Sequence, residues 1–475
     1  MKVRFGLLSS AVAAILSVSA AQATELTAFA VMPANTFATG PTSGQFAGAG
    51  AGGNTLPLID KQPVQGFSAV LHGPTDRSFY VMPDNGFGNQ GNSADTLLRM
   101  YALQPDFKTW NGRKIVGAGT VTPVDFETGQ RLSQFDRRSF ISLRDPRHEL
   151  GFGLVANKGN YPNPLNVAIP VDAEITERQL LTGADFDIES VRRDRWGNLW
   201  FGEEFGPFLI NASPRGRVLR PEIATPNIVP PGSTATGKFV RSPQNPYLGT
   251  DTPNLRGSNG FEGMAINPKG DKLYTLLEGT VAGDDSINAT VNKNLRIDEF
   301  DIRAERYTGR NWIYPLAADG TNIGDMTAVN DHQFLVLERN GATATGGGVP
   351  FKRIFLADID GVKSGGFARK TEIVNLMNVA DPHDLNDDGD ALFTFPYVTI
   401  ESVLILDKST LLVINDNNYP GTGGRDLNSD HTEFLKLRLD RPLKFERDAG
   451  GEGHWHDHDH GDDHDPRGDH GHDHH

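Results

Sequence analysis

Hydrophobic and polar positions recur along the chain as pairs of short apolar runs, not as the spaced apolar positions of a helix. Each run is rich in Val, Ile, Leu, Phe or Tyr, a turn with Gly, Asp or Asn separates the two runs, and the second run ends on an acid or Asn. This pattern is typical of a β-hairpin. Five copies occur, and the acids that close them are Asp84, Glu204, Glu278, Glu338 and Asp416.

The spacing of these closing acids predicts the architecture. Successive acids lie 120, 74, 60 and 78 residues apart, and a repeated four-stranded unit enlarged by loops is typical of a β-propeller. The first interval is long enough to contain one more copy, with strands near 139–143 and 153–156. We therefore expect an all-β propeller of about six blades, with seven also compatible with the length. A β-sandwich or two stacked barrels with incidental hairpins is the alternative.

The N-terminal end differs from this body. Lys2 and Arg4 precede an apolar run and the small-residue pattern Ala21-Gln22-Ala23, which predicts a cleaved secretory signal over residues 1–23. Residues 24–65 are expected to join the first blade. Secretion of a chain without cysteine indicates a bacterial periplasm as the location.

The propeller itself is expected over residues 66–447. Within it, residues 211–254 are rich in Pro, Gly and Thr, which predicts a long insertion that could cover the central funnel. Residues 448–475 consist almost only of His, Asp and Gly, and such a composition predicts a disordered tail. Its imidazoles suit Zn²⁺ or Ni²⁺, and the expected ligands are His454, His456, His458 and His460.

Composition and charge narrow the possible functions. The absence of cysteine excludes disulfides, cysteine nucleophiles and thiolate metal sites. A net charge of −15 argues against non-specific nucleic-acid binding. No apolar stretch beyond the signal is long enough to cross a bilayer, so stable membrane insertion is not expected, and we expect a monomer. Motifs for a serine nucleophile elbow, a Walker loop or a His-Glu-x-x-His zinc site do not occur.

The acids of the repeat are the main candidates for chemistry. Equivalent strand ends of a propeller converge around its central channel, where like charges raise one another's pKa and a cation relieves the repulsion. Carboxylates in this number favour Ca²⁺ or Mg²⁺ over softer metals, and the site we expect is one or more Ca²⁺ ions. Each acid taken singly could instead cap a turn or pair with an Arg. The metal ligands predicted for the channel are Glu189, Glu262, Glu278 and Asp416.

A second candidate calcium site lies in a short acidic loop. Asp384, Asn386 and Asp388 alternate and precede Gly389, as in the first half of a calcium-binding loop. Position 12 of such a loop, normally Glu, is Phe395. A solvated turn without metal explains the pattern equally well.

The repeated motifs resemble a known family. The segments Trp196–Pro207, Gly260-Phe-Glu262-Gly263 with Glu278, Val336–Asn340 and Val413–Asn417 resemble the phytase-like family described by the "esterase-like activity of phytase". The resemblance extends from about Gly66 to Leu437. It departs from the family pattern at Glu189-Ser190, where Glu-Gly is more usual, and at Asp325-Met326 in the fourth copy.

The resemblance implies a β-propeller close to phosphoester hydrolases that use calcium. Together with the acids, it predicts a secreted Ca²⁺-dependent hydrolase in which water attacks a small anionic phosphate ester. Arg339 would stabilise the phosphoryl charge, and the residues expected to bind metal or act as base are Glu203, Glu204, Glu262 and Glu338. A non-catalytic binding propeller braced by metal, or a carboxylesterase, are the alternatives.

Overall fold

The computed structural model describes residues 24–47, 55–287, 293–421 and 423–447, and these residues form an almost entirely β structure. Five antiparallel units of four strands make up the body. From the innermost strand outward, blade I comprises β4 (Phe67–His72), β5 (Phe79–Pro83), β6 (Arg99–Asp106) and β9 (Thr120–Pro123). In the same order, blade II comprises β11 (Ile188–Arg193), β12 (Leu199–Glu203), β13 (Phe208–Ala212) and β14 (Ile223–Ala224).

The remaining three blades follow the same plan. Blade III comprises β15 (Gly263–Ile266), β16 (Lys272–Leu276), β17 (Asn294–Asp301) and β18 (Arg306–Pro315), and blade IV comprises β19 (Asn322–Ala328), β20 (Gln333–Arg339), β21 (Lys352–Asp358) and β22 (Arg369–Asn375). Blade V comprises β25 (Thr399–Asp407), β26 (Thr410–Asp416), β27 (Thr432–Arg438) and, as its outermost strand, β1 (Glu25–Met32).

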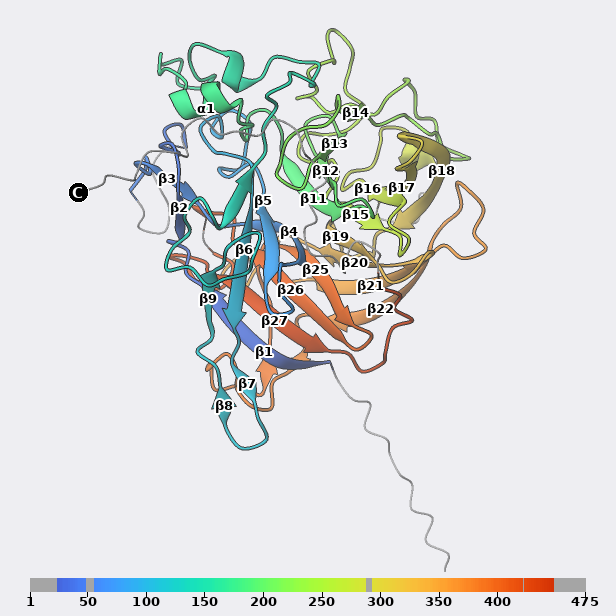
Figure 1. The fold of residues 1–475 in the computed structure, drawn as a ribbon. Coiled ribbons are helices and arrows are strands. Elements are labelled where there is room, and N and C mark those ends of the chain that lie inside the picture. Colours follow the sequence, from blue (N-terminus) through green and yellow to red (C-terminus); the bar gives the residue numbers. More distant parts are fainter. Residues whose placement is uncertain (1–23, 48–54, 288–292, 422, 448–475) are drawn as a thin grey trace, which may run out of the picture.

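The five innermost strands close a ring. β4 contacts β11, β11 contacts β15, β15 contacts β19, β19 contacts β25, and β25 contacts β4 again. Figure 1 shows these strands around the middle of the molecule, with β1, β14, β18 and β22 at the periphery. A separate hydrophobic core fills each of the five spaces between neighbouring blades. The predicted all-β propeller is therefore confirmed, but its described residues form five blades and not about six.

The residues that were expected to supply a sixth blade extend blade I instead. The predicted strand near 139–143 is β10 (Phe140–Ser142), which pairs with β6. The segment near 153–156 is a loop with the short 3-10 helix η1 (Val155–Asn157), followed by helix α1 (Ala173–Arg178). The loop and helix α1 pack in a satellite core of their own. The long first interval thus reflects an enlarged blade, and the five sequence repeats correspond to the five blades.

Burial on both faces explains the apolar character of the strands. In β20, Phe334 and Val336 enter the core shared with blade III, whereas Leu335 and Leu337 enter the core shared with blade V. Successive side chains of a strand point to opposite faces. A blade sandwiched between two others therefore needs apolar residues at consecutive positions, which produces the runs seen in the sequence.

The N-terminal segment closes the ring. β1 pairs antiparallel with β27 along its length and meets β9 of blade I at a single parallel pair, Val31 with Thr120. The segment 24–65, expected to join the first blade, therefore places its first strand in the last blade. The hairpin of β2 (Phe37–Thr39) and β3 (Lys61–Pro63) then leads into blade I. Closure by the N-terminus holds the first and last blades together without a covalent link.

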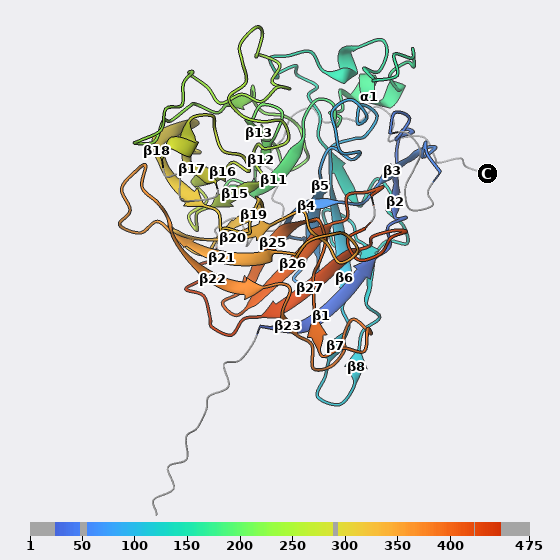
Figure 2. The same cartoon turned by 180° about the vertical axis from the view of Figure 1, so that it is seen from behind.

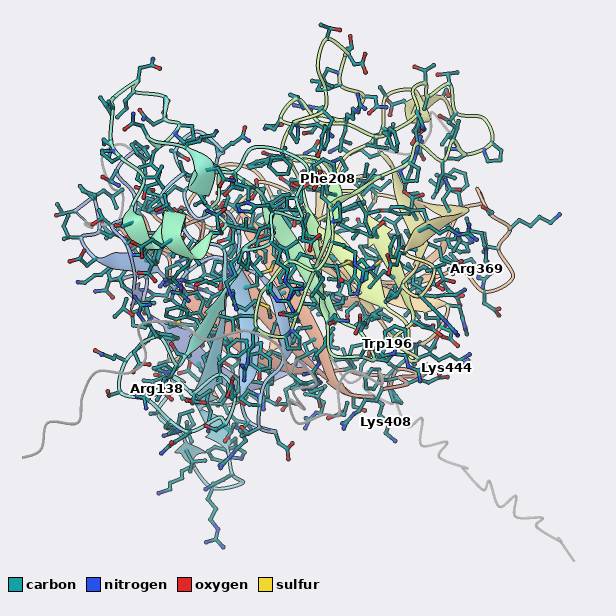
Figure 3. The ribbon with its side chains drawn as sticks, turned by 45° about the horizontal axis from the view of Figure 1, so that its top comes forward. Arg138, Trp196, Phe208, Arg369, Lys408 and Lys444 are labelled. Carbon is teal, nitrogen blue, oxygen red and sulfur yellow. The ribbon has the colours of Figure 1, made fainter. Side chains whose placement is uncertain are left out.

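Loops leave the blades at two opposite ends. Phe208 follows the closing acid of blade II, and Figure 3 shows it away from Trp196 and Lys408, which lie in the tight turns between first and second strands. The closing acids therefore face one end of the propeller. At another edge the hairpin of β7 (Thr109–Trp110) and β8 (Ile115–Val116) projects beside the small pair β23 (Val379–Ala380) and β24 (Leu392–Phe393) (Figure 2).

A further 3-10 helix, η2 (Asp284–Ser286), lies in the loop after blade III. Among the residues that the structure describes, no helix has the length and apolar character that a membrane crossing requires.

Candidate metal centre

The first strand of four blades has an irregularity in its pairing beside the central channel, and blade III has its equivalent residue just before the strand. Strand pairing skips Ser68 in blade I, Glu189 in blade II, Gly324 in blade IV and Glu401 in blade V, and Glu262 occupies the same place before β15 of blade III. A bulged residue is freed from the ladder and its side chain is turned to a new direction. Three glutamates from blades II, III and V consequently point into the channel.

The end of the second strand supplies a second set of channel residues. The Glu204 N–H donates to the Asp187 carbonyl at 2.9 Å, and the Glu278 N–H donates to the Gly260 carbonyl at 2.8 Å, so these two acids hold equivalent places. The equivalent residues of the five blades are Asp84, Glu204, Glu278, Arg339 and Asp416. Blade IV thus contributes an arginine where the other four contribute a carboxylate.

Blade IV also departs from the others at the bulge. A Cβ added to Gly324 would lie 2.0 Å from the Ile400 carbonyl oxygen of the next blade, so no larger residue fits there. The acid at Asp325 is one residue further along and points elsewhere. Its carboxylate accepts the Val403 N–H at 2.8 Å and the Arg192 guanidinium at 3.0 Å.

The residue after the bulge ties neighbouring blades together. The Ser190 hydroxyl donates to the Phe261 carbonyl of blade III at 2.9 Å, and the Ser402 hydroxyl donates to the Phe67 carbonyl of blade I at 2.9 Å. Asp325 performs the same task between blades IV and V. The two departures from the family pattern, Glu189-Ser190 and Asp325-Met326, are therefore variations in blade-to-blade attachment.

The channel acids lie close enough together to share cations. Three groups have carboxylate oxygens within 4.8 Å of one another: Asp84 with Asp187 and Glu189; Glu189 with Glu262 and Glu401; and Glu204 with Glu262 and Glu278. Glu189 and Glu262 each belong to two groups, so the three groups are continuous. Four blades contribute to them.

Several oxygens in these groups have no hydrogen-bond partner. Three of them lack any partner: Asp187 Oδ1, Glu189 Oε2 and Glu262 Oε2. Water cannot replace the missing partners freely, because these residues are at most 6% exposed. A carboxylate oxygen that is buried without a partner loses its hydration and gains no hydrogen bond in exchange, which is unfavourable. Oxygens left free in this way, facing one another from several blades, are the donor set that a hard divalent cation requires. The residues therefore fit a bound metal ion.

Burial and mutual repulsion disturb the ionisation of the group. Burial, followed by the charges of Asp187, Glu262 and Glu401, raises the pKa of Glu189 well above its usual range. Burial and the charges of Glu401 and Glu278 do the same to the pKa of Glu262, which Arg339 only partly offsets. Burial raises the pKa of Asp187 to about 6. A cation in the channel would reverse these shifts.

Two arginines border the acids. Arg339 Nη2 lies 3.1 Å from Glu278, 3.2 Å from Glu401 and 3.3 Å from Glu262. Arg192 extends from blade II to blade IV, where it reaches Asp325 and donates to the Met326 carbonyl at 2.7 Å. Arg192 thereby links two blades that are not neighbours in the ring.

Two predicted site residues lie off the channel. The Glu203 carboxylate accepts the N–H groups of Phe205, Gly206 and Phe208 at 2.7–2.8 Å and so fixes the loop after β12. Burial raises its pKa to about 8. The structure does not support its predicted role as metal ligand or base, because consecutive residues of a strand face opposite ways and Glu203 faces away from the channel.

Glu338 lies off the channel for the same reason, so its predicted role is not supported either. It is fully buried and accepts the Tyr314 hydroxyl at 2.5 Å, the Ala317 N–H at 3.1 Å and the Lys370 ammonium. It stabilises the contact between blades III and IV, while its neighbour Arg339 turns into the channel. The residue of this repeat that reaches the channel is Arg339, not the closing acid chosen from the pattern.

The other predicted metal ligands divide into three cases. Glu189, Glu262 and Glu278 lie in the channel groups. Asp416 faces the same space, but its oxygens accept the Asn418 N–H at 2.7 Å and the Thr399 hydroxyl at 3.2 Å. The predicted tail ligands His454, His456, His458 and His460 lie outside the described residues.

The acidic loop after β23 has the contacts of a turn. The Asp384 carboxylate accepts the Gly389 N–H at 3.0 Å, and the Asn386 amide donates to Asp388 at 2.7 Å. All three side chains are exposed or partly exposed, and they are not among the described groups that could hold a metal. The calcium-loop interpretation is not supported, because Asp384 and Asp388 accept hydrogen bonds that complete the turn, although Asn386 Oδ1 has no partner.

Sequence reasoning omitted three channel acids from the predicted ligand set. Asp84 closes the first repeat, Glu401 opens the fifth, and Asp187 lies two residues before Glu189. Position in the repeat identified the first two as candidates. Asp187 has no equivalent acid in the other blades, and only the fold brings it to Asp84.

A small cavity lies at the loop that follows Glu204. It has a volume of about 190 Å³ and is lined by residues that include Phe205, Phe208, Asp185, Lys158 and Gln244. Phe205 directly follows Glu204, and the long insertion reaches this place, since the Asn245 amide donates to the Gly206 carbonyl at 2.7 Å. A larger cavity of about 560 Å³ lies between the outer parts of blades III and IV, away from the channel acids.

The fold and the centre define a five-bladed propeller with a carboxylate-rich channel suited to divalent cations. The chain belongs to the phytase-like family described as "esterase-like activity of phytase", whose model matches residues 62–419. That range contains every channel acid described above.

The individual proteins that this chain resembles are only distantly similar to it. An uncharacterised secreted protein of Arthroderma benhamiae is 28% identical over 123 residues, which is 24% of either chain. The match thus spans about a quarter of that relative's length. Among solved structures, a luciferin-regenerating enzyme has 10% identity and a TM-score of 0.32 over 81% of this chain and 96% of its own. Regucalcin of Agrobacterium tumefaciens, described as a calcium-binding protein, has 10% identity and a TM-score of 0.34 over 85% and 98%. These two structural likenesses are too weak to bear on blade number or activity.

Proposed function

We propose that this protein is a secreted, calcium-dependent hydrolase of phosphate esters that acts at the acidic channel. The observation that carries the proposal is the set of buried, unpartnered oxygens of Asp187, Glu189 and Glu262. These oxygens need a cation, and carboxylates in this number favour Ca²⁺. Membership of the phytase-like family supports a phosphate ester as the substrate.

The chain's own residues would divide the work as follows. Asp84, Asp187 and Glu189 would hold a cation in one group, and Glu204, Glu262 and Glu278 would do so in another. Bound calcium supplies positive charge next to the phosphoryl oxygens and favours ionisation of a water molecule. Arg339 keeps an unpartnered Nε beside the acids and could donate it to a phosphoryl oxygen.

The cavity lined by Phe205 and Phe208 would take the organic part of the ester. Phe205 and Phe208 give it apolar walls, and Lys158 adds a cation at its edge. The insertion packed on Gly206 covers this side of the channel and would restrict water access. The substrate we propose is therefore a small anionic phosphate ester.

The channel would not need a covalent nucleophile. The serines that follow the bulges, Ser190 and Ser402, give their hydroxyl hydrogens to backbone carbonyls of the next blade. A carboxylesterase mechanism would require one of them to leave that bond. Direct attack by water requires no such rearrangement.

One observation favours a second function. The channel acids are nearly inaccessible, with Glu189, Glu262 and Glu401 only 4–6% exposed. Such burial also suits a cation that braces the five blades of a binding protein without turnover.

The test uses the full mature chain from residue 24, stripped of metal and assayed with and without Ca²⁺. The substrates are p-nitrophenyl phosphate, bis-p-nitrophenyl phosphate, phytate and p-nitrophenyl butyrate. Calcium-dependent phosphate release that is lost in Glu262→Gln supports the hydrolase. A raised melting temperature with calcium and no turnover would favour the metal-braced binding protein, and calcium-independent butyrate hydrolysis would favour the carboxylesterase.

A further inference from the structure

Blade IV replaces two acids of the channel by a single fixed cation. At the bulge, the position of Glu189, Glu262 and Glu401 is taken by Gly324, where even a Cβ would clash with the backbone of blade V. At the second strand's end, the position of Glu204 and Glu278 is taken by Arg339. The ring therefore has a side on which the chain itself supplies the positive charge.

The guanidinium of Arg339 contacts the acids as a point charge. A single nitrogen, Nη2, serves Glu278, Glu401 and Glu262 at 3.1, 3.2 and 3.3 Å. Paired, two-bond contacts with one carboxylate are the usual arrangement for arginine. Here three carboxylates surround one nitrogen, while the Nε of the same side chain has no partner.

Nη2 lies where two of the channel groups meet, because it contacts Glu262 and Glu401 of one group and Glu262 and Glu278 of the other. Calcium–oxygen distances are about 2.3–2.6 Å, so the three oxygens would have to move inward by less than about 1 Å to coordinate an ion at this point. Glu262 Oε2 adds a fourth, unpartnered oxygen close by. By contrast, Arg339 forms its ion pairs with Glu262, Glu278 and Glu401 and none with Asp84, Asp187 or Glu189, so that group stays open to a metal.

We infer that Arg339 is a tethered substitute for a divalent cation: it fills a metal position formed by Glu262, Glu278 and Glu401 and so limits how many ions the channel accepts. Removal of its charge opens that position to Ca²⁺. The inference deepens the proposed function, because it concerns the same channel, but it concerns ion number and selectivity, not turnover.

The experiment counts calcium ions in metal-stripped full mature chain by isothermal titration calorimetry and by elemental analysis after dialysis. Arg339→Gln is expected to bind one ion more per chain than the unaltered protein, and Arg339→Lys, which keeps the charge, is expected to bind the same number as the unaltered protein. The C-terminal histidines and aspartates are common to all variants and cancel in the comparison. An equal count in folded Arg339→Gln, or an extra ion in Arg339→Lys as well, would overturn the inference.

A stability measurement covers the case in which Arg339→Gln does not fold without metal. Arg192→Gln is the matched control, because Arg192 is an equally buried channel arginine that meets one carboxylate, Asp325, and not three. Millimolar Ca²⁺ is expected to restore the melting temperature of Arg339→Gln and to leave that of Arg192→Gln low. Failure of Ca²⁺ to restore Arg339→Gln would contradict the inference.

The result also separates this inference from the proposed function. Extra calcium in Arg339→Gln without phosphate release by the unaltered protein would support the tethered cation and oppose the hydrolase. Phosphate release by the unaltered protein with no extra ion in Arg339→Gln would support the hydrolase and oppose the tethered cation.

Discussion

Two sets of buried acids in this protein differ completely in their surroundings. Glu203 and Glu338 face inter-blade space, where backbone N–H groups, a tyrosine and a lysine occupy their oxygens. Glu189 and Glu262 face the channel, where other carboxylates surround them and one oxygen of each has no partner. Burial is common to both sets. The free oxygen among like charges is what indicates a site for a ligand.

The largest effect should come from neutralising a channel acid. Glu189→Gln and Glu262→Gln keep the side-chain size but remove a charge from the cation site, so calcium-dependent phosphate release should fall at least about 100-fold. Initial rates with saturating Ca²⁺ measure this. Glu338→Gln is the control. A similar fall in its rate would show that activity does not depend specifically on the channel acids.

Glu338→Gln and Glu189→Gln should change the stability of the folded protein in opposite directions. Glu338→Gln removes the negative partner of Lys370 in a buried ion pair. The charge of Lys370 is then uncompensated, and the free energy of unfolding should fall by about 3 kcal/mol. Glu189→Gln removes repulsion and should raise the stability of the metal-free protein. Urea unfolding without metal measures both, and equal destabilisation by the two variants would remove the distinction drawn here.

The pH dependence of the metal-free protein follows from the raised pKa values of the channel acids. A carboxyl whose pKa is higher in the folded than in the unfolded state favours folding when protonated, so stability is present at low pH and is lost as pH rises through the folded pKa. For Asp187, with an ordinary value of 3.8 raised to about 6, the window is pH 4–6 and the effect is roughly 3 kcal/mol. The melting temperature should therefore fall from pH 5 to pH 8.

Calcium and charge removal provide the controls for this pH effect. Millimolar Ca²⁺ should restore the melting temperature at pH 8, and Asp187→Asn should flatten the dependence without metal. A melting temperature that rises with pH in metal-free protein would contradict the account of the channel.

The smallest effect is expected in the acidic loop after β23. Asp388→Asn removes one hydrogen bond of an exposed turn, so the free energy of unfolding should change by no more than about 0.5 kcal/mol and calcium binding should be unchanged. Calorimetric titration measures the binding. Loss of a calcium ion in this variant would revive the calcium-loop interpretation.

Much of the fold could be predicted because its determinants are local. The apolar runs, turns and closing residues recur five times, and burial of each blade between two others makes that pattern visible without tertiary information. The blade count could not be read in the same way. Strand β10 resembles the start of a new repeat, but its partner is β6, and pairing between distant strands is not encoded in either strand alone.

The sequence by itself determined that acids gather at one end of a propeller, because repeat position fixes which strand ends meet. Tertiary structure decided which of them reach the channel. A one-residue bulge turns Glu189 and Glu401 inward, the alternation of a strand turns Glu203 and Glu338 outward, and a backbone contact with Ile400 demands Gly324 in blade IV. These outcomes depend on strand register and on the approach of the next blade, which set side-chain direction and which no single stretch of sequence contains.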